Sequence, residues 1–170
     1  VFFSPAAFMQ EPARWMRAMD RYRGTHSPSP NFGFEVAARK AGDLAGLDLS
    51  CVRVLLNGAE PIRQESEERF VEVYRAAGLP ETAVTHAMGM SEATAKIMTE
   101  PVRRSPPKFV HVDGAAYERN EVVLVARGAA GSRSIASNGF TSGDTRVAIV
   151  DPETRRVLSE DRVGEMWVSG

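Results

Sequence analysis

Residues 52–87 read VRVLLNGAEPIRQESEERFVEVYRAAGLPETAVTHA, and this stretch decides the fold class. Val52 to Leu56 form a short β-branched and apolar run that ends at Asn57-Gly58, which predicts a buried strand followed by a tight turn. Arg63 to Ala77 carry apolar residues at helical spacing and predict a helix. Ala83 to Ala87 fit a second strand. Strand, helix and strand in succession predict an α/β fold with a mostly parallel sheet layer and helices.

Helical and strand-like segments continue on both sides of this stretch. Toward the N-terminus, Pro12 to Thr25 predict an amphipathic helix, Ser27 to Pro30 a turn, and Phe32 to Lys40 a short alanine-rich helix. Toward the C-terminus, Ser91 to Met98 predict another helical piece. We therefore expect residues 1–100 to form the α/β part of the chain.

The character of the sequence changes after Glu100. Prolines and basic residues form a polar connector, and short strand-like runs follow it. These runs are Phe109–Val112, Glu121–Ala126, Val147–Val150 and Glu165–Ser169. We expect a boundary near residue 100, with a smaller, mainly β portion at 101–170.

Composition limits the classes of protein to which the chain can belong. Its 170 residues are 43% hydrophobic and 25% charged, which is ordinary for a globular domain. A formal net charge of −1 removes the electrostatic attraction that nucleic-acid binders usually show, so no nucleic-acid partner is expected. No apolar run approaches the length of a membrane span and no secretory signal is recognisable, so we expect a cytoplasmic protein without a membrane span.

The single cysteine and the three histidines do not predict a metal site. Cys51 precedes an apolar run and is expected to be a small buried hydrophobe. The histidines lie too far apart in the chain for the spacing of a zinc site.

Two strand-to-loop junctions carry the candidate site. They are Asn57–Pro61 and Met88–Thr94. Ligands collect at the carboxyl ends of strands in open α/β sheets, where glycines let the backbone approach closely. Both junctions could instead be simple turns, and their glycine spacing alone favours that interpretation, because such turns are common after strands.

Motifs along the whole chain resemble the fatty acyl-AMP ligases of the adenylate-forming superfamily. The matching segments, in chain order, are Ser4-Pro5, Pro12, Arg14-Trp15, Arg21–Arg23, Thr25–Ser27, Pro30–Phe32, Leu47–Ser50, Asn57–Pro61, Gly89–Thr94, Ile149–Thr154 and Gly164–Val168. The resemblance implies an internal segment of the large N-terminal domain of such an enzyme, and the strand-like chain ends agree with this expectation. Other parts of the family's catalytic apparatus would then lie outside these residues, so the isolated chain is expected to be inactive.

These ligases join a fatty acid to AMP with release of pyrophosphate, and then pass the acyl group to the thiol of an acyl carrier protein. The resemblance therefore implies ATP and Mg²⁺ as cofactors, a fatty acid as substrate and an acyl carrier protein as partner. Gly58, Ala59, Glu60 and Pro61 would form a backbone shelf beside the adenine, and Met88, Gly89, Met90 and Ser91 would enclose its other side.

The resemblance also implies a catalytic carboxylate and an acyl pocket. Glu92 would hold Mg²⁺, since this hard cation prefers a carboxylate and shares its other positions with phosphate and water; alternatively, Glu92 is an acid at a helix N-terminus. Asn31, Phe32 and Phe34 would line the acyl pocket, although both phenylalanines could instead be core residues.

Two features qualify the resemblance. The family usually has a tyrosine at the position of Met88, where methionine keeps an apolar contact but loses ring stacking on the adenine. Thr141–Asp144 resembles the family's ribose-binding Thr-Gly-Asp motif, but it precedes the Val147–Asp151 run instead of lying beyond residue 170. Asp144 is therefore expected to be a turn residue.

Pro106 to Val125 resembles the insertion that marks fatty acyl-AMP ligases and is absent from acyl-CoA synthetases. The resemblance implies that this insertion restrains the movement that would create a coenzyme A site; alternatively, the segment is an ordinary surface hairpin. The sequence thus indicates part of an ATP-dependent fatty acyl-AMP ligase. A fragment of an acyl-CoA ligase, and a non-catalytic module of the same fold that binds an acyl chain or a carrier protein, stay open as alternatives.

Overall fold

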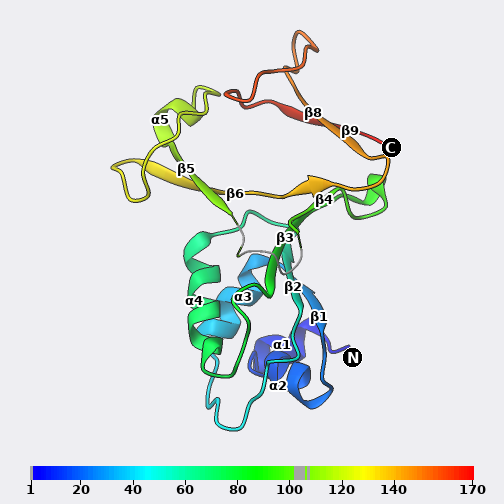
Figure 1. The fold of residues 1–170 in the computed structure, drawn as a ribbon, viewed down its shortest axis with the longest axis vertical. Coiled ribbons are helices and arrows are strands. Elements are labelled where there is room, and N and C mark those ends of the chain that lie inside the picture. Colours follow the sequence, from blue (N-terminus) through cyan, green and yellow to red (C-terminus); the bar gives the residue numbers. More distant parts are fainter. Residues whose placement is uncertain (1, 102–105, 107) are drawn as a thin grey trace.

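A mixed five-stranded sheet forms the centre of the molecule in the computed structural model, which describes residues 2–101, 106 and 108–170. Its strands, in spatial order, are β1 (His26–Ser29), β2 (Val54–Gly58), β3 (Val84–Met88), β4 (Met98–Thr99) and β7 (Phe140–Thr141). The first three are parallel, and β4 and β7 add antiparallel pairs. The predicted α/β class with a mainly parallel sheet is confirmed (Figure 1).

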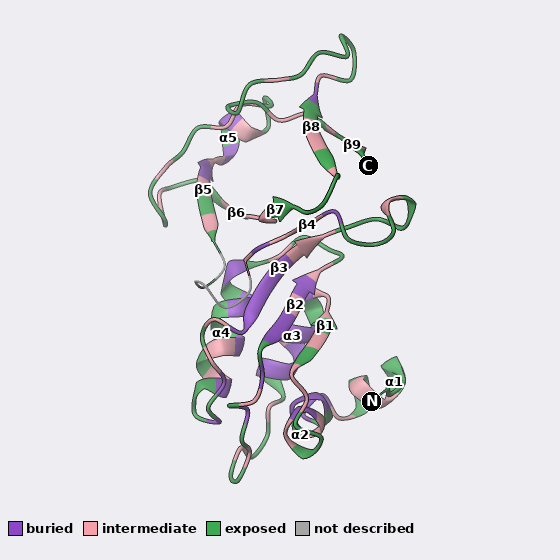
Figure 2. Cartoon of the chain, turned by 45° about the vertical axis from the view of Figure 1, so that its right-hand side comes forward, coloured by how far each residue is buried: buried purple, intermediate pink, exposed green. Residues whose placement is uncertain are grey.

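Four helices accompany this sheet in the first hundred residues that are described. They are α1 (Pro5–Gln10), α2 (Arg14–Arg21), α3 (Asn31–Arg39) and α4 (Gln64–Arg75). The hydrophobic core lies among α2, α3, α4, β2 and β3, and includes Trp15, Phe34, Phe70 and Tyr74. Figure 2 shows most of the buried residues in this part of the chain.

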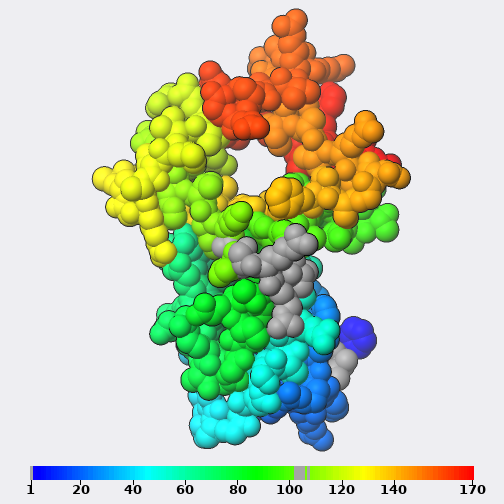
Figure 3. Space-filling model, in the orientation of Figure 1, coloured from blue at the N-terminus to red at the C-terminus, as the bar shows by residue number. Residues whose placement is uncertain are grey.

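The rest of the described chain consists of short antiparallel pairs. Its elements are β5 (Phe109–Asp113), α5 (Gly114–Tyr117), β6 (Ser132–Ala136), β8 (Arg146–Val150) and β9 (Glu165–Ser169). β5 pairs with β6, and β8 pairs with β9. The space-filling view in Figure 3 shows an opening between these two pairs. We call residues 2–100 the α/β region and residues 108–170 the β region.

Tertiary pairing overrides two local predictions in the α/β region. Ser27–Pro30 was predicted as a turn, but His26–Ser29 form β1, whose edge position tolerates Pro28 because one side of the strand needs no ladder partner. Ser91–Met98 was predicted as a helix, but only Ser91–Ala93 form a 3₁₀ turn, called η1. Thr94 and Ala95 then adopt left-handed backbone, with φ of 54° and 73°, and the chain turns back to pair β4 with β3.

The β region also differs from its prediction. Glu121–Ala126 do not form a strand: Glu121 and Leu124 make only isolated bridges, to Arg162 and Val112. The partner of β5 is instead β6, which the sequence did not predict. β7 and α1 were missed as well, and the helix predicted at Pro12–Thr25 is shorter, since α2 ends at Arg21.

Two further sequence expectations meet the structure only in part. The boundary near residue 100 stays a prediction, although β7 crosses it by pairing with β4. The polar connector lies partly outside the described residues, at 102–105 and 107. None of the helices in the described ranges has the length and apolarity needed to cross a lipid bilayer.

Candidate functional site

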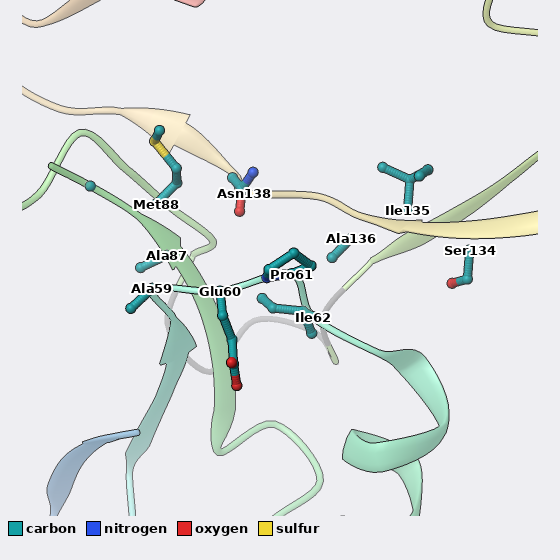
Figure 4. Close-up of a pocket in the computed structure, with 11 residues that line it drawn as sticks. Ala59, Glu60, Pro61, Ile62, Ala87, Met88, Ser134, Ile135, Ala136 and Asn138 are labelled. Atoms are coloured by element: carbon teal, nitrogen blue, oxygen red, sulfur yellow. The ribbon is translucent and has the colours of Figure 1, made fainter. Parts of the chain in front are cut away.

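A cleft of about 380 Å³ lies at the carboxyl ends of β2 and β3. Three segments form its walls: the Ala59–Ile62 loop after β2, Ala87–Gly89 at the end of β3, and Ser134–Asn138 in and after β6. Figure 4 shows the Ala59–Ile62 loop on one side of this cleft and residues of the β6 segment on the other. The volume lies within the range of small-molecule sites. We call this space the first cleft.

Close backbone packing shapes the ends of both strands at this cleft. A Cβ atom at Gly58 would lie 2.3 Å from the Ala87 carbonyl oxygen, and one at Gly89 would lie 1.4 Å from that of Ala95. No side chain fits in either place, so glycine is required by contact with a neighbouring strand or loop. Ala59 follows with a φ of 65°, a left-handed conformation that costs free energy in a non-glycine residue.

The loop after β2 is tied to α3 by two side chains. The Phe32 amide donates to Glu60 Oε1 at 2.5 Å, which places a carboxylate at the N-terminus of α3. The Arg63 amide donates to Asn31 Oδ1 at 3.1 Å, and Asn31 is buried. In Figure 4 the Glu60 side chain points away from the β6 segment. Glu60 therefore holds the loop through its side chain and can offer the cleft only its backbone.

A second, more apolar cleft of about 400 Å³ adjoins the first. The two share Ala59, Ala87, Met88 and Gly89, and the other lining residues of the second are Pro28–Pro30, Leu56, Gly58, Ala95 and Lys96. Lys96 is the one charged residue among those described as lining it. These four shared residues thus lie where a cleft with more polar walls meets an apolar one.

Glu92 lies in η1, exposed to solvent, and lines neither of these two clefts. It lines a neighbouring hollow together with Met90, Thr145 and Lys96, and Lys96 also lines the second cleft. Ser91 is exposed next to Glu92 in the same turn. The second junction predicted from sequence is therefore divided: Met88 and Gly89 face the clefts, whereas Met90 and Glu92 face the hollow.

The residues predicted for the acyl pocket are more dispersed. Phe34 is fully buried, with its ring centroid 5.3 Å from that of Trp15 and 4.9 Å from that of Phe70. Phe32 is 47% exposed, and Asn31 holds the loop after β2 as described above. None of these three residues is among the described residues that line the two clefts, so their acyl-binding role stays a prediction.

Sequence reasoning missed the cleft wall that comes from Ser134–Asn138, and also Ile62 and Lys96. The dipeptide Asn138-Gly139 is a turn signal that could have marked the end of a strand. Two smaller expectations can be compared directly: Asp144 is exposed in a turn, as expected, while Cys51 is half-buried, with its thiol 3.5 Å from the Gly24 carbonyl oxygen.

An ion pair links helix α4 to the β region. Arg127 in the β region forms two hydrogen bonds with Glu68, at 2.8 and 2.7 Å. This guanidinium lowers the pKa of the Glu68 carboxyl. Both side chains are about half exposed, so the pair contributes little to stability.

The family profile of the AMP-binding enzymes matches residues 1–170. The chain is 40% identical over its full length to a 4-hydroxyphenylalkanoate adenylyltransferase of Mycobacterium marinum, and covers 27% of that protein. It is also 38% identical, over 97% of its length, to the medium-chain-fatty-acid–[acyl-carrier-protein] ligase JamA of Moorena producens, and covers 28% of it.

A solved structure agrees with these relatives. The fatty acyl-adenylate ligase of L. pneumophila, in complex with acyl adenylate and pyrophosphate, superposes with a TM-score of 0.90 at 30% identity, over 98% of this chain and 29% of that one. The chain thus spans less than a third of the length of these proteins. With paired clefts at the strand ends and a full-length profile match, this chain belongs to the AMP-binding enzyme family.

Proposed function

We propose that this chain is the part of a fatty acyl-AMP ligase that holds the adenylate, and that the intact protein activates a fatty acid with ATP and transfers the acyl group to an acyl carrier protein. The observation that carries the proposal is the pair of clefts that meet at Ala59, Ala87, Met88 and Gly89. An acyl-adenylate has a polar nucleotide and an apolar chain on either side of one mixed anhydride, and therefore needs two such spaces side by side. The proposed location is the cytoplasm, where ATP is abundant.

In this proposal the first cleft takes the nucleotide. The backbone of Gly58 to Pro61 lies along one side of the adenine, because the tie between the Glu60 side chain and α3 leaves main-chain atoms to face the ring. Met88 and Gly89 enclose the other side. Met90 and Ser91, which follow them outside the cleft, stay proposed nucleotide-binding residues. Met88 offers the adenine a polarizable contact without aromatic stacking.

The second cleft takes the first part of the acyl chain. Its walls expose far more apolar than polar surface, and Pro28, Leu56 and Ala95 are among the residues that provide it. The proposed acyl-pocket residues on α3 are Asn31, Phe32 and Phe34, and this helix follows Pro28–Pro30 directly in the sequence.

Glu92 is the proposed Mg²⁺ ligand. Within the described part of the chain, no group of three or more acidic, histidine or cysteine side chains is arranged to hold a metal. Mg²⁺ does not need such a cluster, because it can bind a protein through one carboxylate and complete its coordination shell with phosphate oxygens and water. The exposed Glu92 carboxylate meets that requirement. When bound, Mg²⁺ would neutralise charge that develops on the transferring phosphoryl group.

The proposal is tested by fatty-acid-dependent ATP–pyrophosphate exchange in the intact protein. Glu92→Gln should lower the exchange rate by about 100-fold with the fold unchanged, since one electrostatic contributor to the transition state is lost. Asp144→Asn is the matched control, because Asp144 is an exposed acid in a turn and should leave the rate unchanged. No exchange in the wild type, or an unchanged rate and Mg²⁺ dependence in Glu92→Gln, would contradict the proposal.

Selection of the carrier protein over coenzyme A is tested with both acceptors. The Pro106–Val125 segment contains β5, which pairs with β6 at the first cleft, so deleting it would damage the nucleotide site itself. Substitution of exposed residues is the cleaner change: Val123 and Leu124 are 47% and 68% exposed. The intact protein should acylate a carrier protein and produce little acyl-CoA, and Val123→Asp with Leu124→Asp should shift this ratio toward acyl-CoA. Efficient acyl-CoA formation by the wild type would contradict the subtype.

A further inference from the structure

A buried polar cluster lies behind the first cleft. Glu67 on α4 and His86 on β3 are buried, and His86 Nε2 lies 2.9 Å from Glu67 Oε2. The same oxygen accepts a hydrogen bond at 3.1 Å from the side-chain amide of Asn57, which is fully buried on β2. His86 Nδ1 lies 2.8 Å from the backbone carbonyl oxygen of Ser137. We call Asn57, Glu67, His86 and Ser137 the buried cluster.

The acceptor at Ser137 determines how protons are arranged in this cluster. A carbonyl oxygen can only accept, so His86 Nδ1 must carry a hydrogen and donate it. One further proton must then lie between His86 Nε2 and Glu67 Oε2, whether the pair is imidazolium with carboxylate or imidazole with carboxylic acid. The pair is therefore neutral as a unit, which reduces the cost of burying two ionisable groups.

Asn57, His86 and Ser137 each lie within two residues of a side chain that lines the first cleft. Asn57 precedes Gly58 and Ala59, at the start of the loop that lines the cleft. His86 itself precedes Ala87 and Met88, and Ser137 lies between Ala136 and Asn138. The cluster thus joins all three walls at one buried point, although none of its members lines the cleft.

A second polar link joins α4 to the β6 wall. Gln64 lies one turn before Glu67 and is also buried. Its Oε1 accepts from Ser134 Oγ at 2.9 Å, and His111 Nε2 lies 3.0 Å from the same oxygen. Gln64 on α4 therefore holds the start of the β6 wall at Ser134, and His86 on β3 holds it near its other end at Ser137.

We propose that Glu67 and His86 are positioning residues for the nucleotide: through Asn57 and Ser137 they hold the β2, β3 and β6 walls at the separation that the nucleotide needs. The β6 segment comes from the sparsely buried β region, where it pairs with β5, and hydrogen bonds with Gln64 and His86 tie it to the α/β region. Loss of the cluster should widen the first cleft and leave the second cleft, which β6 does not line, nearly unchanged. The role assigned to the cleft depends on the function proposed above.

The test compares Glu67→Leu, Glu67→Gln and Tyr74→Phe in the intact protein. Glu67→Leu should raise the KM for ATP about tenfold, the loss expected when one charge-assisted hydrogen bond holding the site is removed. The kcat and the KM for the fatty acid should stay within about twofold, because the second cleft keeps its walls. Glu67→Gln should restore part of the ATP affinity, since its amide oxygen still accepts from Asn57 while the proton shared with His86 is lost.

Tyr74→Phe is the matched control for a merely structural effect. It removes a buried hydrogen bond from the same helix, from the Tyr74 hydroxyl to the Ala37 carbonyl oxygen on α3, away from the cleft. It should lower the melting temperature without changing the KM for ATP. Equal effects of Glu67→Leu and Tyr74→Phe on both KM values, or an unchanged KM for ATP in a folded Glu67→Leu, would overturn the proposal.

Amide hydrogen exchange provides a readout that does not depend on activity. Residues 134–138 should exchange about tenfold faster in Glu67→Leu than in the wild type, and not in Tyr74→Phe. If Glu67→Leu does not fold, His86→Met makes the same test, since it breaks the link to Ser137 and leaves Glu67 with Asn57. A wild type without ATP–pyrophosphate exchange would overturn the proposed function, whereas unchanged amide exchange at 134–138 would overturn the positioning role.

Discussion

The α/β region buries a much larger share of its side chains than the β region does, although both regions contain large apolar residues. The core cluster runs from Trp15 to Val84 and lies wholly in the α/β region. In the described part of the β region, the buried residues are Val112, Gly114, Ala116 and Val150. Large apolar side chains stay exposed there: Val110, Val123, Leu124, Phe140, Ile149, Val157 and Trp167.

This difference implies that apolar burial in the α/β region stabilises the fold, whereas polar contacts with the β region determine the geometry of the cleft. The α/β region has enough apolar burial to position β2 and β3 by itself. The β region supplies a cleft wall, and polar side chains on α4 and β3 hold that wall: Gln64 contacts Ser134, and His86 contacts Ser137. Glu68 on α4 also pairs with Arg127 elsewhere in the β region. A site shared in this way should lose stability and geometry through different substitutions.

The largest effect on stability is expected from the core. Phe70 is fully buried between Phe34 and Tyr74, so Phe70→Ala should lower the free energy of unfolding by about 3–5 kcal/mol, from lost transfer energy and a residual cavity. Trp167→Ala, at a residue 45% exposed in the β region, should cost about 1 kcal/mol or less. Urea unfolding followed by circular dichroism measures both. Equal losses would remove the distinction between the two regions.

Two glycines, Gly58 in the α/β region and Gly128 in the β region, should also differ in the stability that is lost when each is replaced by alanine, with a smaller difference than in the core. Gly58→Ala places a Cβ against the Ala87 carbonyl oxygen, so β2 and β3 must separate, at a cost of about 2–3 kcal/mol. Gly128→Ala meets nothing within 4 Å and should lose only about 1 kcal/mol, because its φ of +78° is unfavourable for alanine. Melting temperatures of the two variants rank them. A larger loss at Gly128 would show that backbone conformation outweighs strand packing.

The smallest effect is expected from the ion pair between the two regions. Arg127 lowers the pKa of Glu68, so the pair stabilises the fold above the unfolded carboxyl pKa of about 4.3 and loses this contribution as pH falls through the lower folded pKa. Because both groups are about half exposed, Glu68→Gln should cost less than about 1 kcal/mol at pH 7. The difference from the wild type should shrink below about pH 4. A difference that grows on acidification would contradict this sign.

Several features of the chain could be predicted from the sequence because their causes are local. The run at Val52–Leu56, the apolar spacing at Arg63–Ala77 and the run at Ala83–Ala87 predicted β2, α4 and β3 within two residues at each end. Hydrophobic periodicity and the turn residues after each strand determine these elements. Gly58 to Pro61, Met88 and Gly89 were placed at the strand ends for the same reason, and the structure brings Ala59 to Pro61, Met88 and Gly89 to the first cleft and Gly58 to the adjoining second cleft.

Tertiary structure alone decided the features that depend on a partner distant in the chain. His26–Ser29 is a strand only because β2 lies beside it, and Ser91–Met98 is not a helix because Ile97 and Met98 pair with β3. The β6 wall was invisible for the same reason, since Ser132–Ala136 is too polar to predict a strand and forms one against β5. His86 read as one more residue of a buried strand. Its partners are the Glu67 carboxylate on α4, 19 positions away in the chain, and the Ser137 carbonyl oxygen, 51 positions away. Hydrogen bonds over such separations leave no local signal in the sequence, so only the tertiary structure shows them.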